Sequence, residues 1–169
     1  EVQKQIKTQI HGGGHEQGLR SGTLATHQIV GMGEACRLAK INLDKEQLRI
    51  QKLRNKFLTR LEELTPIKLN GHPTEHVANY LNISFFGERA DSILSAIKQV
   101  AAVSSGSACN SHHAAPSHVL NALGLTEELA ANTVRFSFGM YTIEEHIITL
   151  LDKISLSLKY NHLKFSVSV

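Results

Sequence analysis

The chain has 169 residues and a formal net charge of +3; 41% of its residues are hydrophobic and 20% are charged. This length and composition predict one domain, or one domain with a long helix and a tail attached to it. The 18 Lys and Arg residues are scattered, which argues against nucleic acid as a stable partner, and the lack of a long apolar run or a signal-peptide pattern argues against membrane insertion and secretion.

The first predicted elements surround a glycine-rich segment. Residues 2–10 alternate between apolar and polar, which predicts an edge strand. Residues 11–23 contain five glycines, so their backbone can approach a ligand closely. Arg20, Ser21 and Thr23 add a guanidinium and two hydroxyls where a helix begins, and such donors suit a phosphate. Glycine-rich loops without a function are common, so a plain loop stays an equal alternative.

The next segment, residues 24–64, has apolar residues at helical spacing and predicts one long helix that Thr23 caps and that ends before Pro66. Lys and Glu residues lie on its outer face. Cys36 lies on its apolar side, so we expect this cysteine to be a core residue and not a reactive one.

Short strands and helices alternate after this helix. The patterns predict strands at residues 67–69, 80–85, 100–103 and 133–138 and helices at residues 90–97, 116–123, 127–132 and 143–158. Thr142, with Glu145 three residues on, predicts a capping box for the last helix, and residues 164–169 fit either a strand or a disordered tail. Together these elements predict an α/β or α+β module, in which helices flank a small mixed sheet.

A cysteine lies in a run of small residues after the third predicted strand. Five of the eight residues from 104 to 111 are Ser or Gly, so this segment is predicted to be a surface loop. Its thiol, Cys109, is a candidate for reactivity, because packed cysteines are usually buried; the alternative is a structural cysteine that follows a strand. Two cysteines are too few for a disulfide framework, so we expect a reducing compartment, cytoplasmic or, in a eukaryote, mitochondrial.

Four segments in order carry a family resemblance: residues 11–23, 29–35, 104–109 and 134–139. They resemble the C-terminal portion of the group I cysteine desulfurases, pyridoxal-phosphate enzymes of the class V aminotransferase fold. The resemblance implies the C-terminal part of a fold type I pyridoxal-phosphate-dependent transferase. Residues 1–23 would then be the end of the large cofactor domain, and residues 24–169 would form a long bridging helix and the small domain with the Cys109 loop.

The resemblance also implies a role for each candidate site residue. Cys109 would take the sulfur of L-cysteine bound to pyridoxal 5'-phosphate, which leaves L-alanine and an enzyme persulfide. Arg135 would hold the substrate carboxylate, with a surface ion pair as its alternative role. Thr23, with Ser21 and Arg20 beside it, would bind the cofactor phosphate of the neighbouring subunit in a homodimer. A sulfur acceptor, such as an iron–sulfur scaffold protein, would receive the sulfur.

One family motif is missing from these residues. Family members carry the cofactor-binding lysine in a Ser-x-His-Lys context shortly before the first predicted strand, and no such stretch occurs here. Without that amine the electron sink of the cofactor is not assembled. We therefore expect a fragment or truncated form that by itself neither binds the cofactor tightly nor turns over cysteine. Two functions stay open: part of a cysteine desulfurase completed by its cofactor-bearing part, or a non-catalytic module that acts as a sulfur relay or dimerisation piece.

Histidines follow the candidate nucleophile. Cys109, His112, His113 and His118 could form a soft metal cluster, but ligands so close together in one loop usually need a second pair elsewhere, so we expect no metal. A protonated imidazole near Cys109 would instead favour its thiolate.

Overall fold

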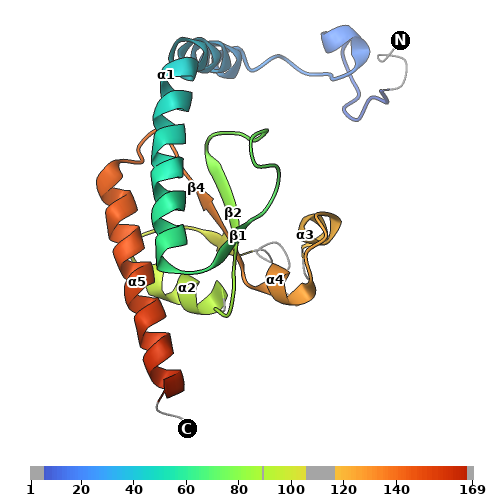
Figure 1. Ribbon diagram of the computed structural model, residues 1–169. Helices are drawn as coiled ribbons and strands as arrows, with labels where there is room; N and C mark the ends of the chain where they lie inside the picture. The colour runs from blue at the N-terminus through green and yellow to red at the C-terminus, as the bar shows by residue number, and fades with distance from the viewer. Residues whose placement is uncertain (1–5, 89, 106–116, 167–169) are drawn as a thin grey trace. The chain divides into compact units, whose positions relative to one another are not determined.

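The computed structural model describes residues 6–88, 90–105 and 117–166 (Figure 1). The chain divides into two compact units, Glu1–Leu43 and Asp44–Val169, and the boundary falls inside the long helix α1 (Thr26–Leu64). The domain boundary predicted between residues 23 and 24 concerns the complete fold of the family and stays a prediction. Each unit is described by itself below.

The second unit is built on a four-stranded sheet with the order β1 (Ile67–Leu69), β2 (Tyr80–Phe85), β4 (Thr133–Ser137) and β3 (Ser104–Ser105). The three neighbouring pairs are all antiparallel. The predicted class, a small sheet with flanking helices and one long helix, is confirmed, but the sheet is antiparallel and not mixed. Alternation along a strand shows which face is buried and not which way the neighbouring strand runs, so the sequence pattern could not settle the direction.

One face of this sheet and three helices enclose the core. The helices are residues 44–64 of α1, α2 (Ala90–Ile97) and α5 (Glu144–Ser166), and Figure 1 shows them beside the sheet. Phe57 of α1 is fully buried, and its ring centroid lies 4.9 Å from that of Phe136 on β4. The remaining core residues alternate along strands or recur at helical spacing, and include Leu53, Leu61, Leu81, Ile83, Phe85, Ile93, Ile97, Val134, Ile147, Leu151 and Ile154.

Two short helices, α3 (His118–Ala122) and α4 (Glu127–Ala131), lie where the sequence predicts them. Thr126 caps α4, because its hydroxyl accepts the N–H of Leu129. The two helices bury a cluster of their own, made of Leu120, Leu125 and Ala130.

Two predicted strands differ from the structure. Among residues 6–10 of the first one, only Ile10 pairs, in an isolated parallel bridge with Arg20. The strand predicted at residues 100–103 begins later, at Ser104, because the N–H groups of Val100 and Ala101 still donate to the carbonyl oxygen of Ile97 at the end of α2. Apolar composition alone could not show that the helix turn continues there.

The last helix begins and ends later than predicted. It starts at Glu144, and the hydroxyl of Thr142 accepts the N–H of Gly139 at 2.9 Å, so Thr142 closes the turn after β4 and does not cap the helix. The predicted tail is helical as far as Ser166. None of the helices in the described ranges is both long and apolar enough to span a membrane.

The first half of α1 is exposed along its whole length. Every residue from 26 to 45 is exposed, among them Ile29, Met32 and Leu43. Cys36 is exposed as well, so the prediction that it is a core residue is wrong for this chain. The apolar stripe that suggested burial is present, but its side chains remain exposed. The helix begins at Thr26, so Thr23 is not its N-cap.

We expect the amide hydrogens of residues 26–43 to exchange at least about a hundredfold faster than those of residues 53–61 in the isolated chain. A helix without tertiary packing is marginal in water, whereas Phe57 and Leu61 in the second half are fully buried. Hydrogen exchange followed by mass spectrometry, with peptides from both halves of α1, measures this ratio. Equal protection of the two halves would contradict the expectation.

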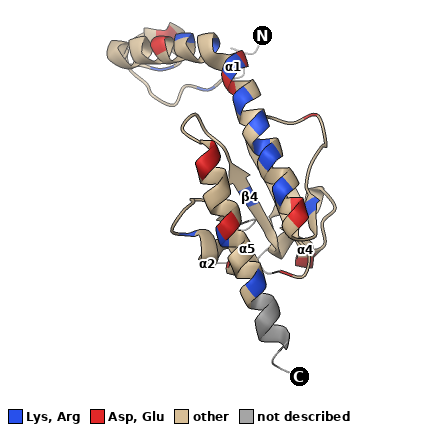
Figure 2. Ribbon diagram, turned by 60° about the vertical axis from the view of Figure 1, so that its left-hand side comes forward, with Lys and Arg blue, Asp and Glu red and all other residues tan. Residues whose placement is uncertain are grey.

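Basic residues recur along one side of residues 44–64 of α1, where Figure 2 shows successive blue segments of the ribbon. They are Lys45, Arg49, Lys52, Lys56 and Arg60. Three of these five pair with a carboxylate: Arg49 with Glu46, Lys56 with Glu144, and Arg60 with Glu63. The hydrogen bond from Arg49 lowers the pKa of Glu46. Much of the positive charge on this helix is therefore neutralised locally.

Candidate functional site

The glycine-rich segment of the first unit, residues 11–23, folds back on itself. The buried hydroxyl of Ser21 donates to the carbonyl oxygen of Gly13 at 2.6 Å, and the N–H of Ser21 donates to that of Ile10 at 3.1 Å. Gly12 has a φ of +149°, and a Cβ there would lie 3.2 Å from the Cβ of Ser21. A side chain at this position would be both strained and crowded, so the glycine serves the packing of the segment on itself.

Arg20 and Thr23 supply the donors that this segment leaves available to a ligand. One guanidinium nitrogen of Arg20 donates to the carbonyl oxygens of Gly22 and Thr23, at 3.2 and 3.5 Å, and both Arg20 and Thr23 are exposed. The hydroxyl of Thr23 has no hydrogen-bond partner among the described residues. The single hydrogen of the Ser21 hydroxyl is already donated to Gly13, so Ser21 holds the loop and has no hydrogen left for a ligand.

These residues fit one end of pyridoxal phosphate. An exposed hydroxyl and a guanidinium beside a tight loop match a phosphate. The carbonyl end of the cofactor needs a lysine, and the Ser-x-His-Lys stretch of the family is absent from the sequence. The chain therefore fits the phosphate and does not by itself fit the whole group.

Arg135 lies on β4, on the face of the sheet opposite to the core. Its neighbours along the strand, Val134 and Phe136, are buried in the core, whereas Arg135 is exposed. In register, Arg135 pairs with Asn82 on β2 and with Ser104 on β3. Its guanidinium makes no hydrogen bond or ion pair with any described residue, so it is available to an anion from outside this part of the chain.

The predicted nucleophile lies outside the described residues, as do His112 and His113. The chain enters that segment from β3, where Ser104 pairs with Arg135. His118 lies at the start of α3. In the part of the chain that is described, no group of three or more His, Cys, Asp and Glu could hold a metal ion, and the metal alternative that includes Cys109 stays untested.

A buried polar network lies next to Arg135 on the same face of the sheet, and sequence analysis missed it. The side-chain amide of Asn70 donates to Oδ1 of Asn82 at 2.9 Å and to Oγ of Ser84 at 2.8 Å. Ser84 in turn lies 2.7 Å from Oγ1 of Thr133, which donates to the carbonyl oxygen of Leu129 at 2.7 Å. The sequence does contain a hint of this network. Asn82 and Ser84 alternate with Leu81, Ile83 and Phe85, which places the polar residues on one face of β2.

Arg49 holds the turn that follows β4. Its guanidinium donates to the carbonyl oxygens of Thr142 at 2.6 Å, Met140 at 2.9 Å and Gly139 at 3.3 Å. The same guanidinium bonds to Glu46, and that hydrogen bond raises the pKa of Arg49. Residues 44–64 of α1 are thereby fixed to the end of the strand that carries Arg135, and nothing in the local sequence marks this contact.

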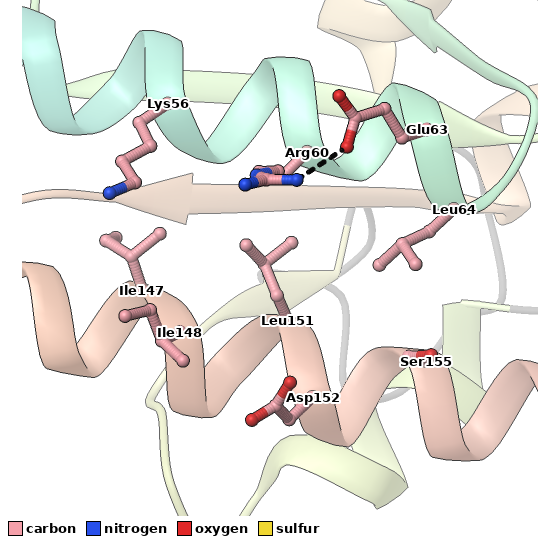
Figure 3. A pocket seen from close by; sticks show the side chains of 9 residues that line it. All are labelled: Lys56, Arg60, Glu63, Leu64, Ile147, Ile148, Leu151, Asp152 and Ser155. Carbon is pink, nitrogen blue, oxygen red and sulfur yellow. Dashed lines mark hydrogen bonds and ion pairs between the residues drawn. The ribbon is translucent and has the colours of Figure 1, made fainter.

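A groove of about 310 Å³ lies between α1 and α5. Figure 3 shows that its walls are helix side chains, which are Lys56, Arg60, Glu63 and Leu64 from α1 and Ile147, Ile148, Leu151, Asp152 and Ser155 from α5. Arg60 bonds to Glu63 at 3.0 Å, and Lys56 pairs with Glu144. Because its cations are already paired, the groove is a poorer site for an amino-acid carboxylate than Arg135.

The chain is similar to proteins of known type. The family described as aminotransferase class V matches residues 3–150. Cysteine desulfurase IscS of Acinetobacter baumannii (strain AYE) is 58% identical over 148 residues, which are 86% of this chain and 36% of that protein. The chain therefore spans little more than a third of the length of this curated relative.

Solved structures agree with this similarity. A NifS-like protein superposes with a TM-score of 0.77 at 30% identity, over 91% of this chain and 39% of that one. A structure titled SspA in complex with cysteine superposes with a TM-score of 0.56, also at 30% identity, over 81% of this chain and 37% of that one.

Proposed function

The chain belongs to the class V aminotransferase family, and from this premise we propose that it is the sulfur-accepting part of a cysteine desulfurase. The active enzyme would need the remaining part of the family fold, in the same polypeptide or as another chain, because this chain spans only 36% of the relative from Acinetobacter. That part would supply the lysine that binds pyridoxal phosphate.

The position of Arg135 carries this proposal. Its guanidinium, which has no partner among the described residues, stands on a strand whose register is fixed on both sides. The neighbour on one side, Ser104, leads into the segment of Cys109. A planar guanidinium matches a carboxylate through two parallel hydrogen bonds. Cys109 follows Ser104 by five positions in the sequence, which supports a role for its thiol at the same site.

Sulfur transfer to Cys109 requires no external oxidant. The bond between Cβ and sulfur of L-cysteine breaks, and a bond between that sulfur and the sulfur of Cys109 forms. The thiol of Cys109 loses its proton, and Cβ gains a proton in its place. The products are L-alanine and a persulfide: carbon is reduced and sulfur is oxidised by the same two electrons. We propose that Arg135 holds the carboxylate and that Cys109 is the nucleophile.

Thr23 and Arg20 would hold the phosphate of pyridoxal phosphate, with Ser21 keeping the loop in shape. When bound, this cofactor withdraws electrons from the α-carbon of the substrate and so labilises the bonds around it. We further propose a cytoplasmic homodimer and delivery of the sulfur to an acceptor such as an iron–sulfur scaffold protein. These finer points rest on the resemblance to the family.

A non-catalytic module is the alternative function. Such a module would keep Cys109 as a sulfur relay, or would serve as a dimerisation piece.

Complementation separates the two functions. We expect the isolated chain, mixed with pyridoxal phosphate and L-cysteine, to form no L-alanine, because the cofactor-binding amine is missing. Adding the part of the Acinetobacter relative that this chain does not match is expected to restore L-alanine formation and the visible absorbance of the bound cofactor. The relative's part alone, without this chain, is the control. No L-alanine from the mixture would favour the non-catalytic module.

A further inference from the structure

Four polar residues line up across the sheet on the face that carries Arg135. Asn82 on β2 and Ser104 on β3 are the register partners of Arg135 on either side. The N–H of Asn70, directly after β1, donates to the carbonyl oxygen of Asn82 at 2.8 Å, which continues the row. Side chains of directly paired residues lie about 5 Å apart at Cβ, so the side chains of Asn82 and Arg135 leave neighbouring positions on the same face of the sheet.

The hydrogen bonds of the network fix which way the amide of Asn82 is turned. The carbonyl oxygen of Leu129 can only accept, so Thr133 donates its hydrogen to it, at 2.7 Å. The hydroxyl of Thr133 must then accept from Ser84, and Ser84 can only accept from Nδ2 of Asn70. This chain of donors leaves Oδ1 of Asn82, and not its Nδ2, facing Asn70.

The Nδ2 group of Asn82 is therefore a directed donor without an acceptor among the described residues. Asn82 is half-buried, and no described residue accepts a hydrogen bond from its Nδ2. Arg135 likewise has no partner in the described ranges. Two neighbouring groups that only donate, one of them charged, match an acceptor that carries negative charge on two oxygen atoms.

We infer that Asn82 is a second carboxylate-binding residue, which donates from Nδ2 to the same substrate carboxylate as Arg135, and that Asn70 is the positioning residue that turns the Asn82 amide. This inference rests on the proposed function for the identity of the substrate. The buried hydroxyls of Ser84 and Thr133 determine which end of the Asn70 side-chain amide faces Ser84.

Kinetics of the complemented protein test the inference. Asn82→Ala is expected to raise KM for L-cysteine about tenfold, with kcat changed by less than about twofold, because the lost bond is made before and during the reaction. Asn82→Asp keeps Oδ1 for Asn70 but puts an anion beside the substrate, so it is expected to raise KM about a hundredfold. Asn70→Ala is expected to raise KM about threefold. Ser137→Ala, on the same face of β4, is the matched control and leaves KM unchanged.

A binding measurement on the chain itself separates this inference from the proposed function. The side-chain amide resonances of Asn82, assigned by their loss in Asn82→Ala, are expected to shift with sodium acetate and not with sodium chloride at equal ionic strength. That result supports the inference even if the complemented protein forms no L-alanine, which would overturn the proposed function alone. Equal shifts with both salts, or an unchanged KM for Asn82→Ala in an active protein, would overturn the inference.

Discussion

The Cys109→Ser variant of the complemented protein is expected to form L-alanine from L-cysteine at least about a thousandfold more slowly than the unchanged protein. A serine hydroxyl stays protonated at neutral pH and cannot form the sulfur–sulfur bond that stores the transferred atom. The rate of L-alanine formation measures the loss, and mass spectrometry of the chain shows whether a persulfide forms. Both signals are expected to disappear together.

The other cysteine provides the matched control for this variant. Cys36 lies on α1, in the other unit, and is exposed, so Cys36→Ser is expected to keep both the rate and the persulfide. If Cys109→Ser kept the rate while Cys36→Ser lost it, the assignment of the nucleophile would be wrong. Loss in both variants would point to a fold defect, which thermal unfolding of the isolated chains detects.

The Arg135→Gln variant is expected to lower kcat/KM for L-cysteine by about a hundredfold to a thousandfold. The carboxylate loses two charge-assisted hydrogen bonds, each about 1.5–2 kcal/mol. Arg135→Lys restores the charge without the planar fork and is expected to recover only part of the loss. Steady-state kinetics at varied L-cysteine concentration gives kcat/KM for the complemented protein and for its Arg135→Gln and Arg135→Lys variants.

A surface arginine shows whether the effect of Arg135→Gln is specific. Arg60 pairs with Glu63 on the exposed face of α1, and such a pair contributes less than about 1 kcal/mol. Arg60→Gln is therefore expected to leave kcat/KM unchanged. An equal loss in Arg60→Gln and Arg135→Gln would exclude a specific role for Arg135 in holding the substrate.

Arg49 helps to hold in place the strand that carries Arg135. It binds three carbonyl oxygens in the turn after β4, while the core contact of Phe57 with Phe136 fixes the middle of the same strand. A strand held at its centre and at its end presents Arg135 at a constant position on the opposite face. This is the physical basis on which the guanidinium of Arg135 can select an orientation of its ligand.

The local predictions succeeded where the pattern reports a property of the segment itself. The periodicities located α1, β1, β2, α2 and β4 to within two residues. The prediction that Cys36 is buried was wrong. An amphipathic stripe indicates that a helix has an apolar face, but it does not show which element, if any, covers that face. The prediction that Thr142 caps the last helix was also wrong, because its hydroxyl accepts the N–H of Gly139 in the turn after β4.

The amino-acid sequence by itself determined the family, the helices and most of the strands, and the candidates Cys109, Arg135, Thr23, Ser21 and Arg20, since these follow from residue types in a fixed order. Tertiary structure alone decided that Arg135 has no partner in the described part of the chain, that Asn82 is its register neighbour, and that the hydroxyl of Ser21 bonds within its own loop. The physical reason is that strand register and the direction of hydrogen bonds join residues far apart in the chain, and no local pattern encodes which of them will meet.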